Sequence, residues 1–172
     1  MAVIVPEPTP EQLVVALAGL FEAELSDPGF MIAAGEYTKD NRMAAQAMRR
    51  EQDGIKGIAI QWKRYVENDG IDTDEFFNTV THIISIRVYK QYLGASSASD
   101  LEESRSYMMK TLWEIGAIVR NNRSLGFDED DVENKMFQMI SDLQEESDED
   151  LGTFHVGEGE LQVECKVFND GC

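Results

Sequence analysis

Apolar and polar residues alternate most regularly in residues 76–94, which read FFNTVTHIISIRVYKQYLG. One row of alternate positions is apolar except for His82, which stands where the pattern predicts another hydrophobic residue. Such alternation is typical of a β-strand, because successive side chains of a strand point to opposite faces of its sheet. Residues 57–66, GIAIQWKRYV, alternate in the same way, and the turn sequence ENDG follows them. We therefore expect two strands that pair antiparallel.

Two segments repeat apolar residues at the spacing of an α-helix. The first covers about 9–25; Thr9 can cap this helix, and Gln12 can complete a capping box. The second opens with a capping sequence at Ser99 and stops at Gly126. Its apolar positions are Leu101, Met108, Leu112, Ile115 and Val119. Each segment has a start signal and one apolar face, so both predict helices that pack on a sheet.

The last third of the chain predicts a further helix and two more strands. Asp128 can cap the helix, in which apolar residues again recur at helical spacing. These residues are Val132, Met136, Ile140 and Leu143. The strands are expected at 152–156 and 160–168, with a turn in the sequence VGEGE between them.

Two segments are less regular. Residues 1–8 are expected to form a flexible arm, because their prolines disfavour helix in the preceding residues. Residues 30–56 are compatible with a short helix or with a long loop. The order of elements favours an α+β fold, in which an antiparallel or mixed sheet of about four strands is packed by two to three helices. With 172 residues in the chain, residues 9–172 are expected to form a single domain.

Residues that carry catalytic chemistry do not gather in the sequence. Both histidines, His82 and His155, lie within strand patterns, and we interpret His82 as a neutral histidine hydrogen-bonded to a neighbour. Cys165 and Cys172 do not have the spacing of metal ligands. The sequence contains no phosphate-binding glycine loop and no nucleophile motif. We therefore predict that the protein is not an enzyme and uses no cofactor.

The composition narrows the class of protein further. A hydrophobic fraction of 42% argues against disorder, although the formal net charge is −18. So large an excess of acid disfavours a protein that coats nucleic acid, since such proteins need a basic surface. Nothing in the sequence resembles a signal peptide or a membrane span. We expect a soluble intracellular protein.

Charge is distributed unevenly along the chain. Residues 39–64 hold seven of the fifteen basic residues and three acidic ones, whereas residues 128–150 hold eleven acidic residues and one lysine. Two segments of unlike charge can dock copies of a chain head to tail. The alternative is that both are solvated surfaces. Trp62 and Trp113 are expected to be core or interface anchors. The candidate subunit-interface residues are Arg42, Arg49, Arg50, Lys56, Asp128, Asp130 and Asp131.

The order of these segments resembles a known family. An amphipathic helix and a long connection precede a strand ending in ISIRVYKQY, and then come the capped helix DLEESRSYMMKTLWEIGAIVRNN and the closing segment LGTFHVGEGELQVECKVF. Over roughly residues 9–168 this order is similar to the tail-terminator (tail-completion) proteins of long-tailed bacteriophages, the lambda-type family. The resemblance implies a ring, usually of six copies, that caps the tail tube, ends its polymerisation and joins the tail to the neck of the filled head.

The same resemblance implies the partners and the location. The partners would be further copies of the chain, the tail tube protein and a neck or head-completion protein, with genomic DNA only passing through the lumen. The protein would assemble in the host cytoplasm and reside in the virion, and no membrane would be involved. Two alternatives remain open, namely another neck or head-completion connector protein and a small acidic inhibitor that mimics DNA. The net charge of −18 favours the mimic, whereas the basic segment 39–64 argues against it.

Overall fold

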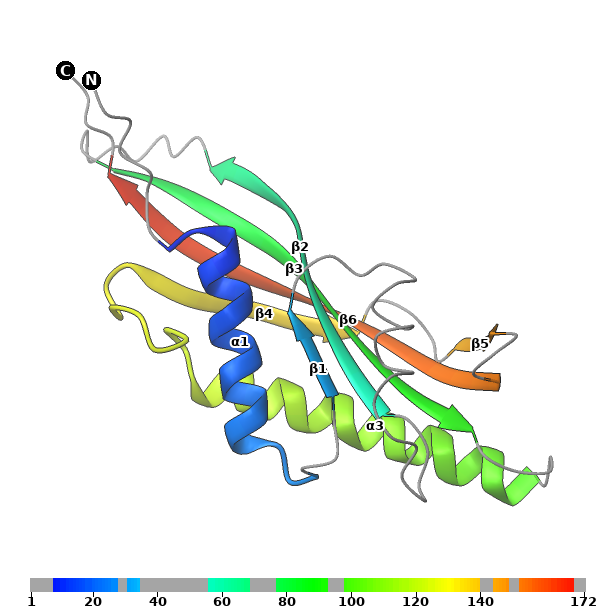
Figure 1. Ribbon diagram of the computed structural model, residues 1–172. Coiled ribbons are helices and arrows are strands. Elements are labelled where there is room, and N and C mark those ends of the chain that lie inside the picture. The colour runs from blue at the N-terminus through cyan, green and yellow to red at the C-terminus, as the bar shows by residue number, and fades with distance from the viewer. Residues whose placement is uncertain are drawn as a thin grey trace.

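The computed structural model describes residues 8–27, 31–34, 56–68, 77–92, 98–139, 144–148 and 152–168. In this part of the chain two helices pack on one face of a twisted six-stranded sheet (Figure 1). The helices are α1 (Pro10–Glu24) and α3 (Ala98–Asn121). The strands are β1 (Met31–Ala34), β2 (Lys56–Asn68), β3 (Phe77–Tyr92), β4 (Val132–Met139), β5 (Gln144–Asp148) and β6 (Gly152–Phe168). The predicted α+β class is confirmed, with six described strands rather than about four.

The start of α1 is formed by the predicted capping box. The Oγ1 atom of Thr9 accepts a hydrogen bond of 3.2 Å from the backbone N–H of Gln12, whose Oε1 accepts one of 2.8 Å from the N–H of Thr9. Pro10 stands at the first helical position, where its missing N–H has no cost. The end of the helix is held against α3, because the carboxylate of Glu114 accepts hydrogen bonds from the backbone N–H and the hydroxyl of Ser26.

The order of strands in the sheet is β1-β2-β3-β6-β4, and β5 pairs with β6 beyond the end of β4. β1 is parallel to β2, and all other neighbours are antiparallel. The predicted antiparallel pair of β2 and β3 is therefore confirmed. β3 and β6 form the centre of the sheet and pair along the whole of β3.

The alternating row of β3 faces the helices and the core. Ile84, Ile86 and Val88 are fully buried there, and His82 is 7% exposed in the same row. The other core residues come from both helices and from the neighbouring strands. They include Leu13, Leu17, Phe21, Ile58, Ile60, Met108, Leu112, Ile115, Val119, Leu161, Val163 and Cys165. The apolar faces predicted from the sequence thus meet in one cluster.

The third helix predicted after Asp128 is wrong. The carboxylate of Asp128 accepts a hydrogen bond of 2.9 Å from the N–H of Asp130 within a turn, and the strand β4 follows. The backbone N–H of Lys166 donates to the carbonyl of Asp131, and β4 then pairs with β6. This pairing with a distant strand outweighs the helical spacing of the local sequence. Ile140 and Leu143 lie outside the described residues.

The turn predicted between two C-terminal strands is also wrong, since β6 runs without a break through VGEGE. A β-carbon added at Gly159 would lie 2.4 Å from the ring of Phe137. The glycine therefore makes room on the sheet for an aromatic side chain from β4, which is a common role of glycine inside a strand.

The remaining predictions have mixed outcomes. The second helix is confirmed, and it ends before Leu125 and Gly126, which have φ values of 54° and 86°. The predicted arm 1–8 lies outside the described residues except for Pro8, which is buried. Of residues 30–56, only the strand β1 and the first residue of β2 are described.

Candidate subunit interface

The predicted interface residues that the structure describes lie at two separate places. Arg42, Arg49 and Arg50 are outside the described residues, and Lys56 is the first residue of β2, without a described side chain. Asp128, Asp130 and Asp131 share the turn between α3 and β4. Since β3 and β6 stand between β2 and β4, the structure separates Lys56 from the three aspartates. Lys56 thus lies on β2, and the three aspartates precede β4 on the opposite side of the sheet.

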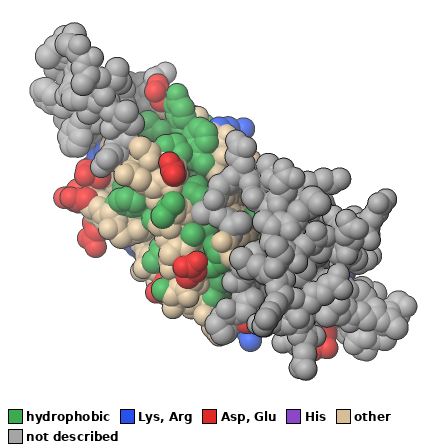
Figure 2. Space-filling model, in the orientation of Figure 1, with side chains coloured by type: hydrophobic (Ala, Val, Ile, Leu, Met, Phe, Trp, Pro, Cys, Tyr) green, Lys and Arg blue, Asp and Glu red, His purple; other side chains and the backbone are tan. Residues whose placement is uncertain are grey.

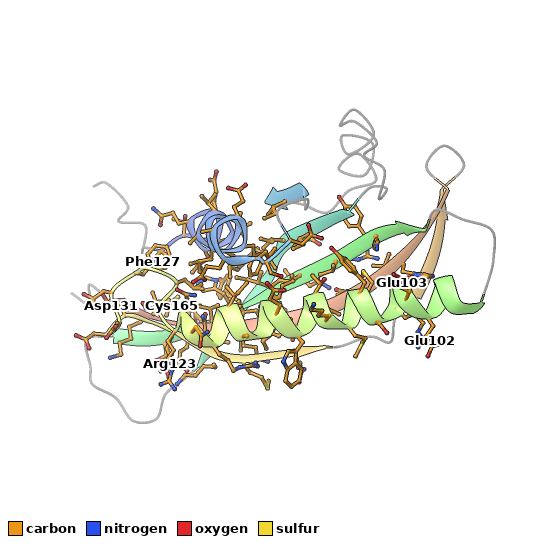
Figure 3. All side chains as sticks on the ribbon, turned by 90° about the horizontal axis from the view of Figure 1, so that it is seen from below. Glu102, Glu103, Arg123, Phe127, Asp131 and Cys165 are labelled. Carbon is orange, nitrogen blue, oxygen red and sulfur yellow. The ribbon has the colours of Figure 1, made fainter. Side chains whose placement is uncertain are left out.

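The acidic turn projects from one end of the molecule. Asp128, Glu129 and Asp130 are exposed, and Asp131 is half-buried. Figure 3 shows Asp131 near Phe127, Cys165 and Arg123, at the opposite end of α3 from Glu102 and Glu103. In Figure 2 acidic side chains gather at the border where this turn lies in Figure 1, and basic side chains appear at the border formed by β2.

β2 has an open edge along its second half. β1 pairs with β2 only from Gly57 to Ile60, so within the described residues 61–68 pair with β3 alone. Five consecutive side chains are exposed there, and Tyr65 and Val66 retain 54% and 46% of their surface. The five residues are Lys63, Arg64, Tyr65, Val66 and Glu67. An edge of this kind presents unpaired backbone N–H and C=O groups to a further strand.

The opposite edge of the sheet is formed by β4, which in the described part of the chain pairs with β6 alone. Its exposed side chains are Glu133, Lys135, Met136 and Gln138. Met136 keeps 43% of its surface in solvent, so this edge also combines charge with an apolar side chain.

The flank of α3 next to β4 extends this apolar surface. A β-carbon added at Gly116 would lie 3.2 Å from the ring of Phe137, so this side of the helix faces β4. Trp113 lies one turn before Gly116 on the same side and is 76% exposed. Met109, one further turn away, is 46% exposed. The guanidinium of Arg120 lies 5.9 Å from the centre of the Trp113 ring.

Exposed apolar residues therefore concentrate at the two edges. Six large hydrophobic side chains are exposed among the described residues, and all but Val15 on α1 lie on β2, on β4 or on the flank of α3. Exposed aromatic and methionine side chains among polar groups are typical of protein–protein contacts. Trp113 was expected to anchor either the core or an interface. Because its side chain is 76% exposed, it does not lie in the core, and only the interface role remains as a prediction. Sequence reasoning missed Tyr65 and Met136.

Part of the predicted basic segment is neutralised within the chain. The ammonium of Lys63 lies 3.2 Å from Glu158, which also accepts a hydrogen bond of 2.7 Å from Ser85. Burial works against ionisation of Glu158, but the hydrogen bonds from Ser85 and Lys63 lower its pKa overall. On β4, Lys135 lies 3.0 Å from Glu133. Lys63 is thus engaged within its own chain, whereas Arg64 on the same edge forms no ion pair with any other described residue.

The chemistry of His82 is that of a structural residue. Its Nδ1 atom accepts a hydrogen bond of 3.0 Å from Nε1 of Trp62, and burial lowers its pKa. Among the described residues, no three His, Cys, Asp or Glu side chains are grouped so that they could hold a metal ion. The thiol of Cys165 is buried, which raises its pKa to about 11 and makes it a poor nucleophile.

Comparison with known proteins adds no family to this description. No protein-family model matches the chain, and a search of the curated proteins finds no match. Neither described helix has both the length and the apolar character needed to span a membrane.

Proposed function

We propose that this protein is a tail-terminator of a long-tailed bacteriophage, which forms a ring at the end of the tail tube and joins the tail to the neck of the head. The observation that carries the proposal is that, within the described residues, the sheet has two open edges, β2 on one side and β4 on the other. Both edges bear exposed apolar side chains, while acid predominates beside β4 and Arg64 lies on β2.

Two different edges on opposite sides support a ring. A contact between β2 of one copy and β4 of the next is heterologous, since each copy contributes a different surface. Heterologous contacts form a closed ring when the rotation between neighbours divides a full turn. An isologous dimer would instead place the same edge of both copies at the contact. The resemblance of the element order to tail terminators sets the expected number of copies at six.

The net charge agrees with a ring that DNA traverses. A formal charge of −18 per chain repels the phosphate backbone, so genomic DNA would pass the lumen without binding. The tail tube protein and a neck protein would contact the two faces of the ring. Residence in the virion follows from this role.

Assembly of the tail tube tests the proposal. The tube protein encoded in the same genome is polymerised with and without this protein, and tube lengths are measured by electron microscopy. We expect shorter tubes of narrower length distribution, each with this protein at one end. Unchanged lengths, or binding along the whole tube, would contradict the proposal.

A further inference from the structure

The hydrogen-bonding registers place the open half of β2 level with β4. Each row across the sheet joins one residue from each of β2, β3, β6 and β4, because these strands are consecutive neighbours. Two of the rows are Val66, Thr81, Glu164 and Glu133, and Gln61, Ser85, Glu160 and Gln138. β1 covers β2 only from Gly57 to Ile60, so it leaves open the half of β2 that lies at the level of β4.

The strand directions match as well. β2 and β6 run the same way because each is antiparallel to β3, and β4 runs the opposite way because it is antiparallel to β6. A second copy placed beside the first in the same orientation therefore brings its β4 antiparallel to β2. The open half of β2 in one copy and β4 in the next are then at the same level, so they can pair without a shift along the strands.

We propose that β4 of one copy pairs antiparallel with residues 61–68 of β2 of a second copy, so that the sheet continues from subunit to subunit. The inference rests on the proposed ring and specifies its contact. Addition of a strand to an open edge is a common mode of protein recognition, in which backbone hydrogen bonds hold the partner.

Side chains on the two edges are complementary in this register. Val66 of one copy lies opposite Glu133 of the next, and Arg64, two residues from Val66, lies on the same face and diagonal to Glu133. Arg64 is also level with Met136, whose exposed side chain can cover the stem of the arginine. The contact thus pairs a cation with an acid and covers apolar surface on both edges.

Disulfide cross-linking at four exposed or half-exposed positions tests this register. The full chain carries Cys172→Ser, and Cys165 stays because it is buried. Two double variants are level-matched: Val66→Cys with Glu133→Cys, and Gln61→Cys with Gln138→Cys. Two crossed variants use the same positions and serve as controls: Val66→Cys with Gln138→Cys, and Gln61→Cys with Glu133→Cys.

Disulfides within one chain are excluded by geometry. β2 and β4 are three strand spacings apart, or about 14 Å, whereas a disulfide joins Cα atoms about 4.4–6.8 Å apart. Any bond formed therefore links two copies. Because all four variants draw on the same substitutions, a loss of folding would affect matched and crossed pairs alike.

In the presence of tail tubes and at the highest soluble concentration, mild oxidation should convert the level-matched variants into a ladder of linked chains, several-fold more than the crossed variants. Equal or greater linkage of the crossed variants, or no linkage in variants whose circular dichroism shows that they fold, would overturn the proposed strand pairing. Rings seen by electron microscopy without level-matched linkage would overturn the strand pairing alone. Absence of both rings and linkage would overturn the proposed function as well.

Discussion

The indole N–H of Trp62 donates a hydrogen bond of 3.0 Å to Nδ1 of His82, across the ladder between β2 and β3. Because Nδ1 accepts this bond, the proton of the neutral imidazole is on Nε2. His82 is 7% exposed in an otherwise apolar row, and burial lowers its pKa. The predicted hydrogen bond to a neighbour is confirmed, and it accounts for a histidine inside a strand that faces the core.

This pair predicts a pH dependence of stability. The folded pKa of His82 lies below its unfolded value of 6.5, so the unfolded chain binds more protons. The stabilisation from neutral His82 is present above pH 6.5 and is lost as the pH falls through the lower folded pKa. In urea denaturation the free energy of unfolding should fall more steeply with decreasing pH in the wild type than in His82→Asn, whose amide oxygen can still accept from Trp62. Parallel pH profiles would contradict the assignment.

Removal of the donor should destabilise the same site. Trp62→Phe leaves Nδ1 of His82 without its partner, which costs about 1–3 kcal/mol for a buried acceptor. A double-mutant cycle with His82→Leu, whose side chain has no acceptor, separates the hydrogen bond from the packing of the indole ring. Additive effects of the two changes would show that the bond contributes nothing to stability.

The close packing of Phe137 on Gly159 makes a second stability prediction. Gly159→Ala places a β-carbon 2.4 Å from the ring, and the forced shift should cost about 1–3 kcal/mol. Gly19→Ala is the control, because nothing lies within 4 Å of that position on α1 and alanine favours a helix by about 0.5–1 kcal/mol. Urea denaturation should therefore show effects of opposite sign, and equal effects would argue against the packing of Phe137.

Trp113 should matter for assembly and not for folding. Because the side chain is 76% exposed, Trp113→Ala should change the free energy of unfolding by less than about 0.5 kcal/mol. The substitution should nevertheless weaken self-association, which is measured by sedimentation velocity in solution or by electron microscopy of rings on tail ends. Val15→Ala, at an exposed position on α1, is the control and should leave association unchanged. A large loss of stability in Trp113→Ala would place the residue in the core instead.

Reversal of charge at the open edge of β2 should weaken the ring. Arg64→Glu puts an acid diagonal to Glu133 of the neighbouring copy, whereas Lys110→Glu changes the same charge at an exposed position on α3. The effect of Arg64→Glu should be larger and should diminish as salt screens the repulsion. The sequence alone predicts a similar effect for reversal at Arg49 and Arg50. Equal effects at Arg64 and Lys110 would count against the charged edge.

The sequence predicts those parts of the fold whose signals are local. The capping box of Thr9 and Gln12 fixes the start of α1 within four residues, and the alternation around His82 defines β3 without knowledge of its neighbours. β4 was missed because a bulge between Asn134 and Met136 shifts its register. Val132, Asn134 and Phe137 pair with core residues of β6, so the strand spacing of two changes to three at the bulge. Apolar Met136 stands four residues after Val132 but is exposed, and the two together imitate one side of a helix.

The candidate interface was only partly predictable for a related reason. The concentration of acid around Asp128 is visible in the sequence, and the structure places these residues in the turn before the edge strand β4. Whether Tyr65 or Met136 is exposed depends on which strands stand at the edges, and that follows from pairings between distant segments. No local pattern distinguishes these residues from buried ones.

The central claim is that copies of this chain close into a ring on the tail tube, and electron microscopy of tube ends with the protein added tests it most directly. In dilute solution we expect a monomer–hexamer equilibrium or a plain monomer, because contacts between charged edges depend on the tube as a template and weaken with salt. On tube ends we predict a closed ring of six copies at one end only. A dimer at the ends, or no protein there, would contradict the claim.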